Sequence, residues 1–198
     1  MKHPYPSRLL DHQGQPLHWA RNLPIVVDFW DDSPALVRAQ TTMAMDAWNK
    51  RAQKICGMTL FRHAGRTDGV VQIMVGLKVP ENLEFDLSGW NGLSGTSVRG
   101  FGPSTDWDGS EVGDDEGEPG ECALKWNKDG EILCASIGVT NYSAPDAYAA
   151  ALHELGHALG LDHIQHHAFV MNSRHSPLLR LNLGEILAAC GKVPEETP

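Results

Sequence analysis

The sequence predicts an α/β (α+β) fold, and three observations support this. Short apolar stretches of strand length alternate with longer stretches in which apolar residues recur every three or four positions. Their order is strand, long helix, two strands, hairpin and two further helices, which is typical of a sheet layered with helices. The 198 residues are enough for one domain with its own hydrophobic core.

The first predicted strand, Leu23–Phe29, leads into a long helix. Ser33 is expected to be the N-cap of this helix and Pro34 its first helical residue, because serine and proline favour these two positions. The helix is predicted from Ala35 to about Lys54, with one apolar face. Gly57 is expected to end it in a left-handed conformation.

Four further strands bring the predicted sheet to about five. Two are separate strands, 58–63 and 70–75, and two form a hairpin, 123–126 and 132–139.

The chain also contains two capped helices. The first starts at Ser143-Ala-Pro-Asp146, with Ser143 as its cap and Asp146 three residues later, and continues through the good helix formers of 147–159. The second, 183–190, has the same capping-box spacing in Asn182 and Glu185. Gly160 and Gly191 are expected to end them.

The charge balance excludes some partners. A formal net charge of −9 argues against nucleic acid or an anionic membrane surface, since both need basic protein surface. No stretch approaches the roughly 20 apolar residues of a membrane span. The first residues lack the apolar core of a signal peptide, so we expect either a cytosolic protein or one whose leader has been removed.

An acidic stretch carries eight carboxylates between Asp106 and Glu121. It is either a solvated acidic loop or a structural calcium site, because Ca²⁺ prefers several oxygen ligands from one flexible loop. The candidate calcium ligands are Asp106, Asp108, Asp114 and Asp115.

Four cysteines, Cys56, Cys122, Cys134 and Cys190, are too few for a disulfide scaffold. Cys122 and Cys134 flank the predicted hairpin turn. They face each other only if the loop comprises residues 127–129, whereas a two-residue Asp-Gly turn shifts the register by three. A Cys122–Cys134 disulfide and free buried thiols both remain open.

The segment HELGHALGLDH carries the chemistry. His153 and His157 are four residues apart, so a helix places both imidazoles on one face, with Glu154 beside them. Gly160 allows a reversal that brings His163 to the same ion as a third nitrogen ligand. Three neutral imidazoles leave coordination positions open for water, as in catalytic zinc sites.

HELGHALGLDH followed by Met171 resembles the metzincin clan of zinc endopeptidases, which carries HExxHxxGxxH and then a methionine turn. The eight-residue step from His163 to Met171 resembles the matrixin branch. FWDDSPALVRAQTTMAMDAWN, TDGVVQIMVG and LNLGEILAACGK also look matrixin-like, so the resemblance covers roughly residues 22–192. Asn172 and Ser173 stand where matrixins often have Tyr-Pro.

This resemblance implies a mixed twisted sheet with two long helices, including the active-site helix, and a small C-terminal subdomain with one helix. Residues 1–21 would be an irregular lead-in, 22–192 the catalytic domain with its lower part from 161, and 193–198 a tail. His153, His157 and His163 would bind zinc, Glu154 would be the general base, and Met171 would lie beneath the metal.

The resemblance also implies how substrate binds. A protein or peptide substrate would add as an antiparallel strand to the sheet edge, formed by Ala123, Leu124, Lys125 and Trp126. Asn172 and Ser173 would help to form the wall of the specificity pocket. Active endopeptidases are usually kept out of the cytosol, so by analogy we expect an exported protein. We also expect a monomer.

The leading hypothesis is therefore a zinc-dependent endopeptidase. One alternative is a catalytically inactive zinc-binding interaction module, which would not need a carboxylate beside the metal. Another is a zinc amidase acting on a non-protein amide, because the same chemistry serves any amide bond.

Overall fold

A computed structural model describes residues 6–10, 14–19, 23–65, 71–77, 120–127, 129–139, 143–166, 168–172 and 180–192. The strands in these ranges are β1 (His18–Trp19), β2 (Ile25–Phe29), β3 (Phe61–His63), β4 (Ile73–Gly76), β5 (Gly120–Trp126) and β6 (Glu131–Val139). The helices are α1 (Ala35–Cys56), α2 (Ala144–Ala158) and α3 (Leu183–Ala189). The predicted α/β class is confirmed.

The described strands form one mixed sheet in the order β1-β6-β4-β2-β3, and β5 pairs with β6 outside this order. At Ile132 of β6, β1 and β5 are both partners. All neighbouring pairs are parallel except β5 and β6, which are antiparallel, with Ala123 opposite Ser136. Among the described strands β5 pairs only with β6, so it forms one edge of the described sheet.

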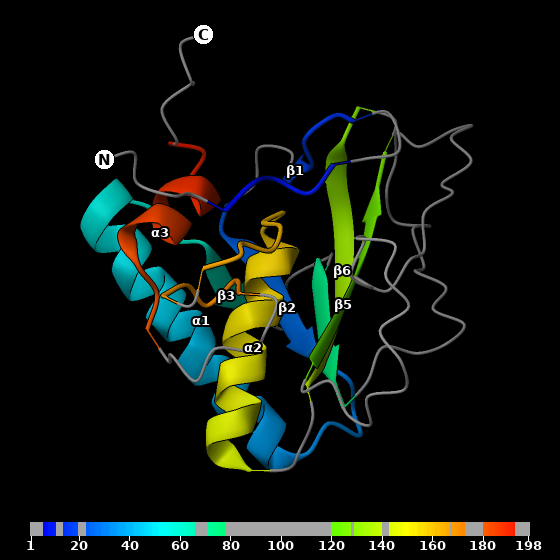
Figure 1. Cartoon of the computed structure of the whole chain (residues 1–198). Coiled ribbons are helices and arrows are strands. Elements are labelled where there is room, and N and C mark those ends of the chain that lie inside the picture. Colours follow the sequence, from blue (N-terminus) through cyan, green and yellow to red (C-terminus); the bar gives the residue numbers. More distant parts are fainter. Residues whose placement is uncertain are drawn as a thin grey trace, which may run out of the picture.

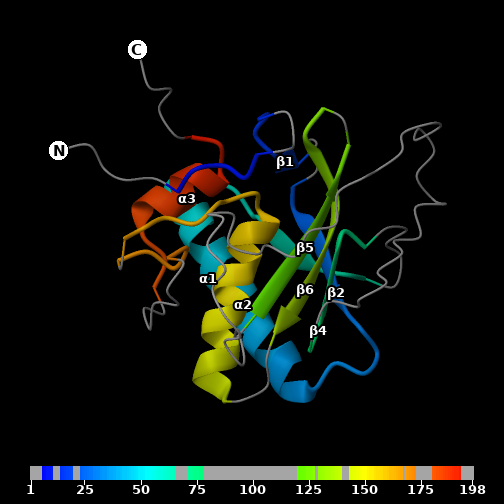
Figure 2. The same cartoon turned by 45° about the vertical axis from the view of Figure 1, so that its right-hand side comes forward.

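Helices α1 and α2 lie side by side on one face of the sheet, and α3 lies near the C-terminal end of α1 (Figures 1 and 2). The core between these layers is apolar, and α2 contributes mainly small residues to it: Ala147, Ala150, Ala151 and Ala158 are at most 1 % exposed. Small side chains let neighbouring backbones approach closely. The helix that carries the histidines is therefore fixed on several sides.

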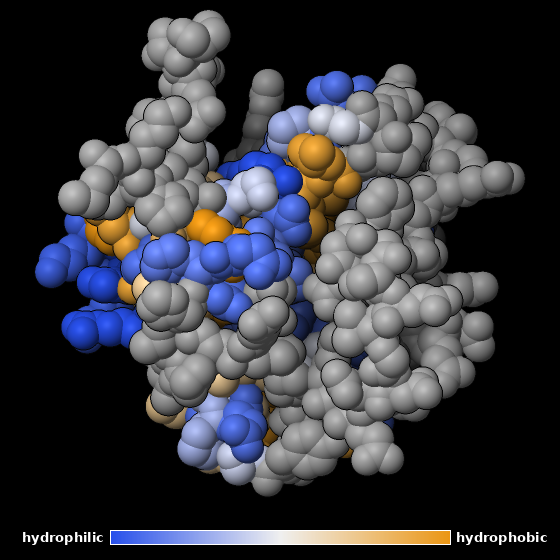
Figure 3. All heavy atoms as spheres, viewed as in Figure 1, coloured by the Kyte–Doolittle hydropathy of each residue, from blue (hydrophilic) through white to orange (hydrophobic). Residues whose placement is uncertain are grey.

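Large exposed hydrophobic side chains are scattered, on Leu10, Leu23, Met43, Leu77 and Leu183. On the face seen in Figure 3, hydrophobic residues occupy small areas separated by hydrophilic ones. None of the helices in the described ranges has the length and apolarity needed to cross a bilayer.

The predicted N-cap of α1 is wrong by one residue. Pro34 is the N-cap, and its carbonyl accepts the first helical hydrogen bond from Arg38 N–H at 3.0 Å. The Ser33 hydroxyl instead donates to the Val75 carbonyl of β4 at 2.8 Å. Ser33 is buried, and a carbonyl from another strand competes successfully for its hydroxyl.

The other helix ends agree with the prediction. Gly57 ends α1 with φ 70°. Ser143 caps α2 by accepting from Asp146 N–H. Asn182 and Glu185 form a reciprocal capping box on α3. Strand β1 was not predicted; it is two residues long and exists through its parallel pairing with β6.

The four cysteines are free thiols, so the alternative with a Cys122–Cys134 disulfide is wrong. In the hairpin register Cys122 pairs with Ile137 and Lys125 pairs with Cys134, three positions from direct opposition. Burial raises the pKa of the Cys134 thiol to about 12, which disfavours the reactive thiolate form.

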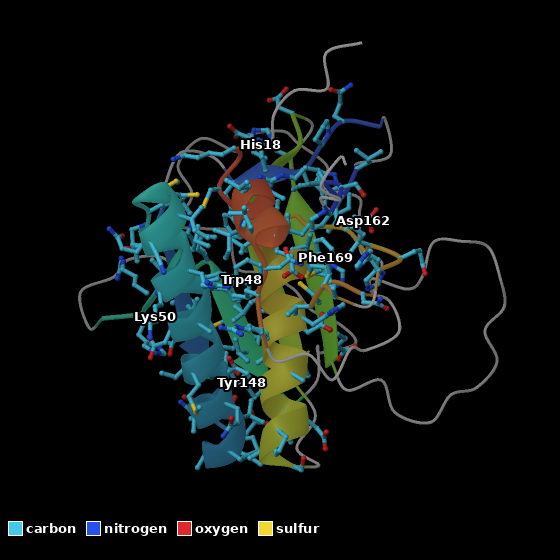
Figure 4. The ribbon with its side chains drawn as sticks, turned by 60° about the vertical axis from the view of Figure 1, so that its left-hand side comes forward. His18, Trp48, Lys50, Tyr148, Asp162 and Phe169 are labelled. Carbon is cyan, nitrogen blue, oxygen red and sulfur yellow. The ribbon has the colours of Figure 1, made fainter. Side chains whose placement is uncertain are left out.

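Trp48 couples α1 to the helix that carries the histidines. It is fully buried between the two helices (Figure 4), and its indole Nε1–H donates to the Leu152 carbonyl at 3.0 Å. Trp48→Phe removes this hydrogen bond and leaves a small void. We expect urea unfolding to show a loss of about 1–3 kcal/mol. The half-buried Trp126 provides a matched control, and an equal or larger loss from Trp126→Phe would contradict the prediction.

Candidate metal centre

Three histidines converge at the C-terminal end of α2. His153 and His157 lie one turn apart on α2 and are 4 % and 1 % exposed, and the half-buried His163 comes from the chain after the helix. The Nε2 atoms are 3.0 Å apart between His153 and His157, and 3.1 Å apart in both pairs that include His163. In the described part of the chain these residues form a group able to hold a metal ion.

Main-chain carbonyls orient two of the rings. His153 Nδ1 lies 2.7 Å from the Val170 oxygen, and His157 Nδ1 lies 2.9 Å from the Leu161 oxygen. A carbonyl oxygen can only accept, so Nδ1 donates its hydrogen in both rings. In a neutral imidazole Nε2 then carries the lone pair. Both rings therefore direct a metal-binding lone pair toward the space shared with His163.

The turn after α2 brings the third histidine back. Gly160 has φ 80°, a left-handed conformation that glycine adopts without strain. Its N–H donates to the His157 carbonyl at 2.8 Å, and Leu161 N–H donates to the Gly156 carbonyl at 3.1 Å. The Asp162 side chain accepts from His163 N–H at 2.7 Å. The predicted helix stop at Gly160 is confirmed.

The nitrogen geometry fits zinc. Three nitrogens that each lie about 2.0–2.1 Å from one zinc ion are roughly 3.0–3.4 Å from each other. The observed Nε2 separations of 3.0–3.1 Å fall in this range. The second-layer hydrogen bonds from Nδ1 to carbonyls are also those that zinc-binding histidines ordinarily make.

The Glu154 side chain is 3 % exposed. It extends from α2 toward Gly120, the first residue of β5. A Cβ built on Gly120 would be 2.7 Å from Cγ and 2.9 Å from Oε1 of Glu154. Such contacts are too short for carbon, so a side chain at position 120 would force the Glu154 side chain to shift. No sequence pattern marked Gly120, because its contact with Glu154 joins residues far apart in the chain.

Met171 lies against α2 at the glycine between the two histidines. It is fully buried, and a Cβ on Gly156 would lie 2.2 Å from its Sδ atom. Its carbonyl accepts from Ile164 N–H at 2.8 Å, which ties the methionine turn to the residue after His163.

Glu185 of α3 was predicted only as a capping residue, yet it also holds the methionine turn. Its Oε1 accepts from Met171 N–H and its Oε2 from Asn182 N–H, both at 2.9 Å. Burial raises the pKa of this carboxyl group, and backbone N–H groups, including that of Val170, oppose the shift. The Val170 carbonyl in turn orients the His153 ring. Glu185 of α3 therefore supports His153 indirectly, through the backbone of Val170.

The remaining predicted site residues divide into two groups. Ala123 and Leu124 are buried in β5, Lys125 and Trp126 are half-buried there, and Asn172 is buried directly after Met171. Ser173 and the candidate calcium ligands lie outside the described residues, as do residues 78–119 as a whole.

An α/β domain in which three histidines meet at the end of a buried helix supports a zinc metallopeptidase. The family model described as Matrixin matches residues 25–182, and the chain belongs to the matrixin family. No curated protein and no solved structure matched the chain.

Helix propensity alone predicts that Gly156→Ala stabilises the protein, whereas the close contact with Met171 predicts that it destabilises the protein. Alanine favours helix over glycine by about 1 kcal/mol, yet Gly156→Ala should lower the unfolding free energy by about 1–3 kcal/mol through overpacking against Met171. A double-mutant cycle with Met171→Ala checks this by denaturation. If Gly156→Ala costs as much in the Met171→Ala background as in the wild type, the contact is not the cause.

The raised pKa of Glu185 predicts a pH dependence. The ordinary pKa of this carboxyl group is 4.5. Between pH 4.5 and the raised pKa of the folded state, the folded protein holds more of this proton than the unfolded chain does. The unfolding free energy of the wild type should therefore fall, relative to Glu185→Gln, as pH rises from 4.5 to the folded pKa. Urea titrations of both metal-free proteins at matched pH measure this difference. A constant difference across the window would contradict the prediction.

Proposed function

We propose that this protein is a zinc-dependent endopeptidase in which His153, His157 and His163 hold the metal and Glu154 is the general base. The observation that carries the proposal is the convergence of three Nε2 atoms at 3.0–3.1 Å, at the end of a helix in which the buried Glu154 directly follows His153. Zinc held there would make a water molecule more acidic and draw electron density from the substrate carbonyl.

Glu154 moves the proton in this reaction. Its carboxylate accepts a proton as water attacks the peptide carbonyl carbon, and then gives that proton to the leaving amine as the C–N bond breaks. The side chain is buried between α2 and β5, where little solvent competes for its oxygens. A scaffold that only bound zinc would not need a carboxylate at this position.

The proposed substrate is an extended peptide that adds to β5. In the described sheet, one side of β5 pairs with β6 and the other has no partner strand. A peptide added there gains main-chain hydrogen bonds, which favours protein substrates with an extended segment. Because β5 begins at Gly120, directly over Glu154, a peptide along this edge would pass close to the base.

Several finer points belong to the same proposal. Asn172 and Ser173 follow Met171 and would contribute to the pocket wall, and the acidic stretch would bind structural calcium. Matrixins typically act outside the cell, so we propose an exported enzyme that works as a monomer.

Glu154→Gln tests the general base. The substitution keeps the shape of the side chain but removes its ability to accept a proton. We expect one zinc per protein by atomic emission and a loss of at least about 10²–10⁴-fold in kcat on unfolded casein. Glu131→Gln, at the start of β6, is the matched control and should keep wild-type activity. Wild-type rates in Glu154→Gln would exclude it as the base.

His157→Ala separates the ligand role from the catalytic one. It should reduce both zinc content and activity, whereas Glu154→Gln reduces activity alone. Stoichiometric zinc in His157→Ala would remove His157 from the ligand set.

Incubating the wild type with a peptide library and with non-protein amides separates a peptidase from an amidase. Activity on neither indicates the inactive binding module.

A further inference from the structure

The N-terminal segment, residues 6–10 and 14–19, precedes the part of the chain that matches the matrixin model, residues 25–182. It nevertheless lies against the turn that carries His163. Arg8 forms an antiparallel bridge with Leu161, and β1, at the end of the segment, joins the sheet beside β6. Asp162, which directly precedes His163, lies beside the end of α2 (Figure 4).

The segment satisfies the carbonyls that α2 cannot satisfy itself. Helices leave their last carbonyl groups without intrahelical donors, and buried ones need other partners. Ala158 O accepts from Trp19 Nε1–H at 2.6 Å, Leu159 O from Arg8 Nη1 at 2.6 Å, and Gly160 O from Leu9 N–H at 2.9 Å.

A fourth hydrogen bond continues the same contact. Asp162 N–H donates to the Ser7 carbonyl at 2.8 Å. The segment also occupies the space beside Gly160, where a Cβ would lie 3.0 Å from Leu17 O and 3.3 Å from Arg8 Nη1. It thus contacts the chain from the end of α2 to the residue before His163.

Arg8 joins two helix ends. Its Nη1 donates to Leu159 O of α2, and its Nη2 donates to Ala188 O of α3 at 2.7 Å. Both carbonyls lie at C-terminal ends, where the helix dipole favours a positive charge. The planar guanidinium reaches both at once, which the single ammonium group of lysine cannot do with the same geometry.

The two helices that Arg8 joins hold different parts of the site. The end of α2 leads to His163, and α3 carries Glu185, which bonds to the methionine turn. That turn includes Val170, whose carbonyl orients His153. One guanidinium therefore fixes the relative position of the elements that support two of the three histidines.

We infer that Arg8 is a positioning residue for the metal site, and that the N-terminal segment sets zinc affinity by holding the 158–162 turn. This inference rests on the proposed zinc function. It assigns a role in the site to a part of the chain outside the family match.

The test measures zinc affinity directly, by competition with a chromophoric chelator on the full chain, alongside the melting temperature. Arg8→Met keeps the length of the side chain and removes both hydrogen bonds. We expect its zinc dissociation constant to rise roughly 5–10-fold, less than the about 10–100-fold caused by losing a direct partner of a ligating histidine, because Arg8 acts on the histidines through the turn. Arg8→Lys keeps the charge and should give an intermediate value.

Arg38→Met is the matched control. Arg38 is also half-buried and donates to main-chain carbonyls, from Nη2 to Trp30 O at 2.6 Å and Asp31 O at 3.3 Å, and from Nε to Ser33 O at 3.0 Å. These carbonyls lie in the connection from β2 to α1. Arg38→Met should lower the melting temperature without changing zinc affinity more than about two-fold.

The outcomes are distinct. Zinc affinity that stays at the wild-type value in Arg8→Met, or in Arg8→Lys if the methionine variant fails to fold, overturns the inference and leaves the zinc site intact. Equal weakening by Arg38→Met also overturns it, because the effect would then be one of general stability. A wild type that binds no zinc contradicts the proposed function itself and the inference with it.

Discussion

Two hydrogen bonds from imidazole Nδ1 atoms to main-chain carbonyls govern the geometry of this site. They fix the ring orientation and tautomer of His153 and His157, so that both Nε2 atoms face His163. Neither carbonyl belongs to α2, because Val170 and Leu161 both follow the helix. The site therefore depends on how the chain returns after α2 as much as on the helix itself.

That returning chain is held from two directions. The N-terminal segment bonds to residues 158–162, and Glu185 of α3 bonds to the methionine turn. The ionisable groups of Arg8 and Glu185 are both partly removed from water, which costs solvation free energy. Hydrogen bonds to the backbone offset this loss of solvation. Such contacts have strict directions, whereas apolar packing does not, so they are suited to fixing the position of a loop.

Close backbone approach makes the site compact. Gly120 leaves space for the Glu154 carboxyl group, and Gly156 leaves space for the Met171 sulfur. With the small residues of α2, these positions bring the edge strand, the helix and the methionine turn together around three histidines. The site therefore depends on the glycines at 120 and 156 as well as on the residues that carry the chemistry.

Local patterns in the sequence determined the three helices, most of their caps, and the common face of His153 and His157, because these depend on residues within a few positions of each other. The tertiary structure alone decided contacts between distant residues. Ser33 bonds to β4 instead of capping α1, the hairpin register keeps Cys122 and Cys134 apart, and Arg8 reaches two helix ends. Sequence periodicity carries no information about such partners, since strand register and the return of the chain choose them.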